Sequence, residues 1–113
     1  MLSLFLDRLR KDPLSIEFKE TLSVIDSLYL FTPTAFKNGS LENEANQNNG
    51  SCKIFSFAKK HHLSEKETLY CFGKFYTDDV LQHPNKEDHQ NIRNFIKTGW
   101  GGIQFNSEAL KLK

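Results

Sequence analysis

The sequence contains few of the residues that define several common classes of protein. Only two cysteines occur, Cys52 and Cys71, far apart in the chain. This excludes a disulfide framework and is typical of reduced thiols in a cytosol. Acidic and basic residues almost cancel, 14 against 15, and both kinds are spread along the chain. No net field therefore collects phosphate backbones, and nucleic acid is not an expected partner.

A long hydrophobic run is also missing. The apolar start Met1–Leu6 is interrupted by charged residues from Asp7 onward, so we expect neither a signal peptide nor a membrane span. Phenylalanine is abundant instead, with 10 residues in a chain of 113 that is 38% hydrophobic and 26% charged. This length and composition predict one domain over residues 1–113, packed around aromatic side chains. We expect a cytoplasmic monomer without a cofactor.

Hydrophobic periodicity and capping residues predict five short helices. The last is the clearest, with Ile92, Phe95 and Ile96 expected to face inward and Gly99 placed to end it. In chain order, the helices are expected from Leu2 to the Asp12-Pro13 stop, from a Ser15 cap to Tyr29, from a Ser51 cap toward His61, from a Ser64–Glu67 capping box through Tyr76, and from Asp88 to Gly99.

Strands are expected where the helical periodicity fails, between Tyr29 and Gly50 and again after Gly99. Aromatic residues near 31–37 and a kinked stretch at 100–105 predict two segments that pair as antiparallel strands. The fold class predicted is therefore α+β, with about five short helices packed on a small antiparallel sheet of two to three strands. The last eight residues are expected to fray.

Two segments are richer in side-chain amides than core packing requires. Five asparagines fall between Asn38 and Asn49, and Asn91 and Asn94 share the last predicted helix with Arg93. Such a composition indicates a hydrogen-bonding role, inside the fold or toward a ligand. The residues expected to contact a ligand are Asn38, Gln47, Asn48, Asn49, Cys52, Asp79, His83, His89, Asn91, Arg93 and Trp100.

Arg93 and Trp100 each allow two interpretations. Arg93 is one of three arginines beside twelve lysines, and its guanidinium can bind a carboxylate or phosphate with two parallel hydrogen bonds. Alternatively, it forms a structural salt bridge with an aspartate. Trp100 is either an anchor of the core or the wall of a pocket. The aspartates considered as structural partners of Arg93 are Asp26, Asp78, Asp79 and Asp88.

Cys52 is the candidate nucleophile of an enzyme. It lies near the start of a predicted helix, where free backbone amides and the helix dipole favour a thiolate. With His83 or His89 as the base and Asn91 orienting the ring, the set loosely resembles the Cys-His-Asn arrangement of papain-type proteases. Alternatively, Cys52 faces inward as a small hydrophobic residue.

Asp78, Asp79, His83 and His89 are of types that bind zinc or iron. Their spacing matches no recognised metal motif, and acidic residues near helix ends are commonly dipole partners. We therefore expect no metal site.

Four runs in order along the chain resemble the HopJ type III effector family, over roughly residues 5 to 109. The resemblance implies a stand-alone α+β domain named after proteins that bacteria inject into host cells, and hence a host protein as one conceivable partner. It carries over no catalytic residues. The four runs are Phe31–Gly39, Asn46–Lys53, Asp78–Leu81 with His83-Pro84, and Asp88–Phe95 with Gly99–Ile103.

Three functional hypotheses follow. The first is a module that binds a small ligand or peptide in a polar pocket between the loop 46–52 and the helix 88–99. The second is a cysteine hydrolase, which requires an exposed Cys52 close to a histidine ring nitrogen. The third is a protein interaction module with an exposed apolar patch and no cleft.

Overall fold

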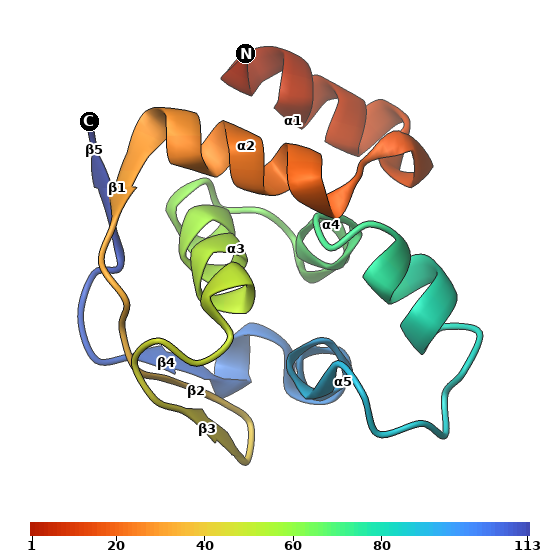
Figure 1. Cartoon of the computed structure of the whole chain (residues 1–113). Helices are drawn as coiled ribbons and strands as arrows, with labels where there is room; N and C mark the ends of the chain where they lie inside the picture. The colour runs from red at the N-terminus through yellow and green to blue at the C-terminus, as the bar shows by residue number, and fades with distance from the viewer.

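Helices and short antiparallel strands are interleaved along the chain (Figure 1). A computed structural model describes residues 1–113, and none of its helices combines the length and apolarity that crossing a bilayer requires. The elements are α1 (Leu2–Lys11), the 3-10 turn η1 (Pro13–Ser15), α2 (Phe18–Leu28), β1 (Tyr29–Phe31), β2 (Phe36–Asn38), β3 (Leu41–Asn43), α3 (Asn49–Lys60), α4 (Glu65–Tyr70), the π-helix η2 (Phe75–Val80), α5 (Gln90–Thr98), the 3-10 turn η3 (Gly99–Gly102), β4 (Ile103–Phe105) and β5 (Leu110–Leu112).

The first two helices are separated at the predicted proline. Helix α1 ends at Lys11, directly before Asp12-Pro13, because the residue before a proline avoids the helical region. The second helix begins at Phe18, so the prediction that Ser15 caps it was wrong. The Ser15 hydroxyl instead donates to the Asp12 carbonyl at 2.8 Å and accepts from Arg8 Nε at 3.0 Å, which stabilises the turn.

The predicted capping box of α4 is confirmed. The Glu67 amide donates to the Ser64 hydroxyl at 3.0 Å, and the Ser64 amide donates to the Glu67 carboxylate at 2.8 Å. The helix nevertheless ends at Tyr70 rather than continuing to Tyr76, because Gly73 adopts a left-handed φ of 61°. A side chain there would lie 2.8 Å from the backbone nitrogen of Phe18, so this close approach requires glycine.

The strands form two sheets rather than one. Strand β2 lies between β3 and β4, with Phe36 opposite Phe105, which confirms the predicted pairing of these regions. The second sheet pairs β1 with β5, so the prediction of a frayed C-terminus was wrong. Leu110 is fully buried, and the Lys113 amide donates to the Leu28 carbonyl at 3.0 Å. The last residues are thus held by both packing and backbone hydrogen bonds.

Phenylalanine side chains dominate the core, as predicted. Six of the ten phenylalanines are buried, and Phe55 lies among three of them. Its ring centroid is 4.9 Å from that of Phe95, 5.5 Å from that of Phe72 and 6.1 Å from that of Phe36. Aromatic rings from β2, α3, α5 and the turn after α4 therefore meet at one point, which fixes the relative positions of these elements.

Helix α5 ends at Gly99 with a positive φ of 59°, as predicted. Ile92 and Phe95 face inward, but Ile96 is 46% exposed, so its predicted burial was wrong. The inward face is completed by Asn91 and Arg93 instead. Residue 96 lies only about 40° from residue 92 around the helix, so its exposure comes from its place at an open surface depression beside Leu81 and Pro84 rather than from its angular position.

Candidate functional site

A cluster of buried amides joins the two asparagine-rich segments. Asn91 of α5 accepts hydrogen bonds at Oδ1 from the Nδ2 groups of Asn38 and Asn43, at 3.0 and 3.1 Å. Its own Nδ2 donates to Asn43 Oδ1 at 3.0 Å, and Asn48 Nδ2 donates to the same oxygen at 2.7 Å. The loop before α3, the β2–β3 hairpin and α5 are therefore held together by side-chain amides. Much of the predicted hydrogen-bonding capacity is used inside the fold.

The starts of α3 and α5 share an unusual conformation. The residues that precede them, Asn48 and His89, both adopt the left-handed region, with φ of 54° and 52°. Neither side chain caps its helix. The first backbone amides to donate to a carbonyl in these helices are those of Cys52 and Arg93, so the amides of residues 49–51 and 90–92 have no partner within the chain. Two sets of free donors thus remain near each other.

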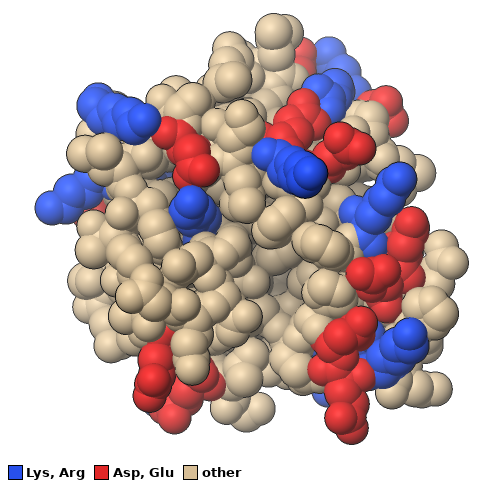
Figure 2. All heavy atoms as spheres, viewed as in Figure 1, with Lys and Arg blue, Asp and Glu red and all other residues tan.

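A hollow of about 360 Å³ lies between these two helix starts. Its polar edge comes from Asn48, Gly50 and Ser51 of the loop and first turn of α3, and from the first turn of α5. Figure 2 shows this face hollowed near its centre, with charged side chains lying mainly toward the periphery. The full lining is Phe18, Leu41, Asn48, Gly50, Ser51, Phe72, Phe75, His89, Gln90, Asn91 and Ile92.

One side of the hollow consists of aromatic rings. The Phe75 ring lies 4.9 Å from that of Phe18 at a steep angle and 4.9 Å from the imidazole of His89 at a shallow one. Phe72 completes the wall, stacked 6.4 Å from Phe18. Phe75 remains 38% exposed although it is large and apolar. A partly exposed aromatic wall beside free hydrogen-bond donors is the usual composition of a ligand site.

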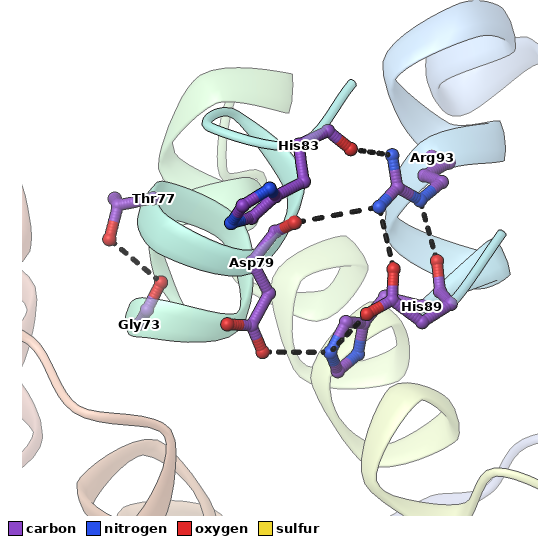
Figure 3. A network of polar contacts seen from close by, with 7 residues as sticks. Gly73, Thr77, Asp79, His83, His89 and Arg93 are labelled. Atoms are coloured by element: carbon purple, nitrogen blue, oxygen red, sulfur yellow. Dashed lines mark hydrogen bonds and ion pairs between the residues drawn. The ribbon is translucent and has the colours of Figure 1, made fainter. Parts of the chain in front are cut away.

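His89 is held at the rim by Asp79. Its Nε2 lies 3.0 Å from Oδ2 of Asp79, which comes from the π-helix η2 (Figure 3). A carboxylate of the neighbouring Asp88 lies 3.9 Å from the same nitrogen. This contact joins η2 to the start of α5.

Arg93 acts as a structural clamp behind this pair. Its side chain is largely buried, and its guanidinium donates to the carboxylate of Asp88 at 2.6 Å and to the Asp88 carbonyl at 2.6 Å. It also donates to the carbonyls of His83 at 2.9 Å and Asp79 at 3.5 Å (Figure 3). The hydrogen bond from Arg93 holds the pKa of the Asp88 carboxyl below its usual range. Four of the five guanidinium hydrogens are used within the chain, which supports the structural interpretation of Arg93.

Cys52 lies in the core and not in the hollow. It is 1% exposed, and its thiol donates to the Thr34 carbonyl at 3.5 Å. Burial raises the pKa of this thiol, which opposes formation of the thiolate. No histidine ring bonds to it. The geometry required for a cysteine hydrolase is therefore not met, and the interpretation of Cys52 as a ligand contact or nucleophile is corrected to a core residue.

The remaining predicted site residues lie outside the hollow. Gln47 is exposed and accepts from the Glu44 amide at 3.0 Å. His83 is also exposed and takes part in the clamp only through its carbonyl. Trp100 packs 5.1 Å from Phe95 and donates from its indole to the Leu63 carbonyl at 3.1 Å, so it anchors α5 to the turn before α4.

Asn38 and Asn49 differ from these residues because each carries a buried Oδ1 without a hydrogen-bond partner. Asn38 is completely buried, so it belongs to the amide cluster rather than to the surface of the hollow. Metal-binding residue types do not gather either, since no three His, Cys, Asp or Glu side chains are placed to hold an ion. Asp78 bonds only to the neighbouring Thr77 hydroxyl, at 3.2 Å.

Sequence reasoning missed the aromatic wall and the role of Ser51 and Gly50 at its edge. Phe18, Phe72 and Phe75 were indistinguishable from core phenylalanines, because each falls at a position compatible with a buried helix face. The one available signal was Gly50 between Asn49 and Ser51, since a side chain at residue 50 would meet the Phe18 ring at 2.8 Å. A glycine at a helix start can mark such a close approach.

Comparison with known proteins agrees with the resemblance inferred from the four sequence runs. Among solved structures, the chain is similar to the protein VPA0580, whose crystal structure is described as that of a protein of unknown function; the two share 56% identity over 100% of this chain and 94% of that chain, with a TM-score of 0.98. None of the curated proteins matches the chain. The model of the family described as "HopJ type III effector protein" matches residues 2–110, and the chain therefore belongs to the HopJ family.

Proposed function

We propose that this protein is a binding module whose ligand, a small molecule or one side chain of a peptide, occupies the hollow between α3 and α5. The observation that carries the proposal is the convergence of Asn48–Ser51 and His89–Ile92 on one hollow with an aromatic wall. Ligand sites are typically concave and largely apolar, with a few polar groups that fix orientation. The hollow has this composition.

The free backbone amides at the helix starts define what such a ligand offers. Residues 49–51 and 90–92 present donors that the chain itself leaves unbonded. A ligand with a carbonyl or carboxyl oxygen would satisfy them, while a flat apolar part would pack against Phe75. No lysine or arginine lines the hollow, so hydrogen bonding rather than ion pairing is the expected means of recognition.

Protein NMR with benzamide as the probe tests this proposal. Benzamide carries a flat ring and an amide oxygen, and an isolated fragment of this size binds with a Kd on the order of millimolar. We expect its titration to move the amide signals of residues 48–51 and 89–92 together and to saturate. Absence of saturable shifts, or shifts centred on another part of the surface, would contradict the proposal.

A tryptophan substitution supplies the control. Ser51→Trp fills the hollow, because Ser51 lines it, and should abolish the benzamide shifts. Ser107→Trp introduces the same side chain at a separate hollow bordered by Lys60 and Ala109 and should leave the titration unchanged. Equal titrations of the two variants would remove the hollow between α3 and α5 as the binding site.

We also propose that the protein acts as a monomer in a cytoplasm. Because the family name links members to type III secretion, this cytoplasm is either that of the bacterium or that of a host cell. The free thiols of Cys52 and Cys71, both buried, are compatible with a reducing compartment. Light scattering of the purified protein tests the monomer, and a dimer at micromolar concentration would contradict it. Fractionation of cells that carry a tagged chain tests the compartment.

A further inference from the structure

His89 is the only ionisable side chain that lines the hollow, and its hydrogen bonding determines what it can offer a ligand. Asp79 Oδ2 lies 3.0 Å from Nε2. A carboxylate can only accept, so in the neutral ring the hydrogen lies on Nε2 and the lone pair on Nδ1. Nδ1 has no partner within the chain, since Nε2 is the only ring atom that forms a hydrogen bond. The ring therefore offers a free acceptor.

Two uncommon backbone conformations meet at this pair. His89 lies in the left-handed region, with φ of 52°. This conformation costs free energy for any residue that carries a side chain. Asp79 lies in a π-helix, a conformation that is rare and frequently occurs at functional sites. The Arg93 clamp holds both segments through their carbonyls. The fold thus retains two unfavourable conformations whose shared effect is to present the His89 ring at the rim.

The carboxylates near His89 both lie at Nε2, which favours a hydrogen on that nitrogen and leaves Nδ1 free in the neutral ring. Asp79 faces the ring from η2, and Asp88 lies 3.9 Å away in the loop before α5, where it is already paired with Arg93. Phe75 covers one face of the ring, and α3 contributes Asn48, Gly50 and Ser51, which are uncharged. No lysine or arginine lines the hollow, so none donates to Nδ1 in place of a ligand.

We propose that the hollow recognises an aromatic ring that carries one hydrogen-bond donor, such as a phenol, with the ring on Phe75 and the donor bonded to Nδ1 of His89. This inference rests on the proposed function of the hollow and names the chemical class of its ligand. The same chemistry can come from a free phenolic molecule or from a tyrosine side chain of a peptide. His89 is then the residue that determines specificity.

Paired ligands with and without the phenolic donor test the proposal by NMR titration. In one arm p-cresol is compared with 4-methylanisole, and in the other N-acetyltyrosine amide is compared with N-acetylphenylalanine amide. One added hydrogen bond corresponds to about fivefold tighter binding of the hydroxyl ligand in each pair. A preference in the first arm alone identifies a free small molecule, and a preference in both includes tyrosine.

Three results separate the inference from the proposed function. Equal affinities within both pairs overturn the inference while leaving the hollow as a binding site. No saturable shifts with any of the four ligands overturn the inference, and they overturn the proposed function as well only if benzamide also fails to bind. A long-range ¹H–¹⁵N spectrum that shows the His89 hydrogen on Nδ1 in the free protein at neutral charge also overturns the inference, because the acceptor would then be absent.

Substitution and pH supply the matched controls. His89→Asn keeps a residue that tolerates the left-handed region and should reduce the preference for p-cresol to about one, while His83→Asn, in the same loop but outside the hollow, should preserve it. If His89→Asn fails to fold, acidification of the natural protein gives the same test. The NMR signals of the His89 ring report when it takes up a proton, and the preference for p-cresol must vanish at the same point. A preference that persists overturns the inference.

Discussion

Removal of the Asn91 side chain should destabilise the protein more than any other single amide substitution on α5. Asn91 is 5% exposed, and its side chain takes part in three hydrogen bonds, with Asn38 and twice with Asn43. At about 1 kcal/mol for each bond, Asn91→Ala should lower the free energy of unfolding by about 3 kcal/mol. With a slope of about 1.5 kcal/mol per molar urea, the unfolding midpoint falls by about 2 M.

Asn94→Ala is the matched control on the same helix. Its side chain donates one hydrogen bond, at 3.3 Å to the Asn38 carbonyl, and is only part-buried. We therefore expect a loss of about 1 kcal/mol or less. Urea titrations followed by tryptophan fluorescence of Trp100 report both variants. If Asn91→Ala lost no more stability than Asn94→Ala, the amide cluster would not be what holds β2, β3 and α5 together.

Asn91→Asp probes the same cluster through pH. In the natural protein Asn43 Oδ1 accepts a hydrogen bond from Asn91 Nδ2, so in the variant a carboxylate oxygen would face this oxygen without a hydrogen between them. The carboxylate would also be buried. Both effects favour the protonated acid in the folded state, so its folded pKa is raised above the unfolded value. The variant should be closest to the natural protein below the unfolded pKa of aspartate, near pH 4, and lose stability as the pH rises toward neutrality. A variant more stable at pH 7 than at pH 4 would contradict this reasoning.

Four further outcomes are expected. Burial raises the pKa of the Cys52 thiol, so in the folded protein it should react with a disulfide reagent at neutral pH far more slowly than in urea; equal rates would mean that it is accessible. Ser64→Ala should cost about 1 kcal/mol in thermal unfolding, because it removes the cap of α4. The hydrogen bond from the Ser64 backbone is the main cause that lowers the pKa of Glu67. The stability that the Glu67 carboxylate contributes is therefore present above its unfolded pKa and is lost as the pH falls through its folded pKa. Glu67→Gln should make the free energy of unfolding fall less steeply with acidification, and an unchanged pH dependence would refute this. Gly99→Ala should reduce stability, because φ is 59° and the added carbon would displace the Glu65 carboxylate from its hydrogen bond with the Trp100 amide. A neutral result in calorimetry would contradict that geometry.

Local signals in the sequence were sufficient for features that depend on adjacent residues. The capping box of α4, the Asp12-Pro13 stop and the Gly99 terminus each involve residues within one turn of each other, and all three were predicted correctly. The β2–β4 pairing was also found, because aromatic residues and turn signals border both strands.

Features that depend on contacts between distant residues could not be predicted from local signals. Strand β5 is stabilised by Tyr29–Phe31, some eighty residues earlier, and nothing in its own composition distinguishes it from a loose end. The left-handed conformation at His89 likewise accompanies the Arg93 clamp, whose guanidinium bonds to the carbonyls of Asp88 and of His83 earlier in the loop. Asn48, His89 and Asn91 of the hollow were expected from the composition of their segments, whereas its aromatic wall required knowing that Phe18 and Phe75 meet.

Both ends of the chain rest against the last turn of α2. The Ser27 hydroxyl lies 3.1 Å from the Met1 sulfur, and the Lys113 amide bonds to the Leu28 carbonyl, so both ends lie near α2, the N-terminus above it and the C-terminus beside β1 (Figure 1). Immobilisation on a sensor surface through either end would therefore leave the opening between α3 and α5 facing the buffer. A short peptide that joins the two ends would allow a circular permutation with new ends in the exposed stretch 84–88. If the permuted chain still folds, this loop is not needed as a continuous connection.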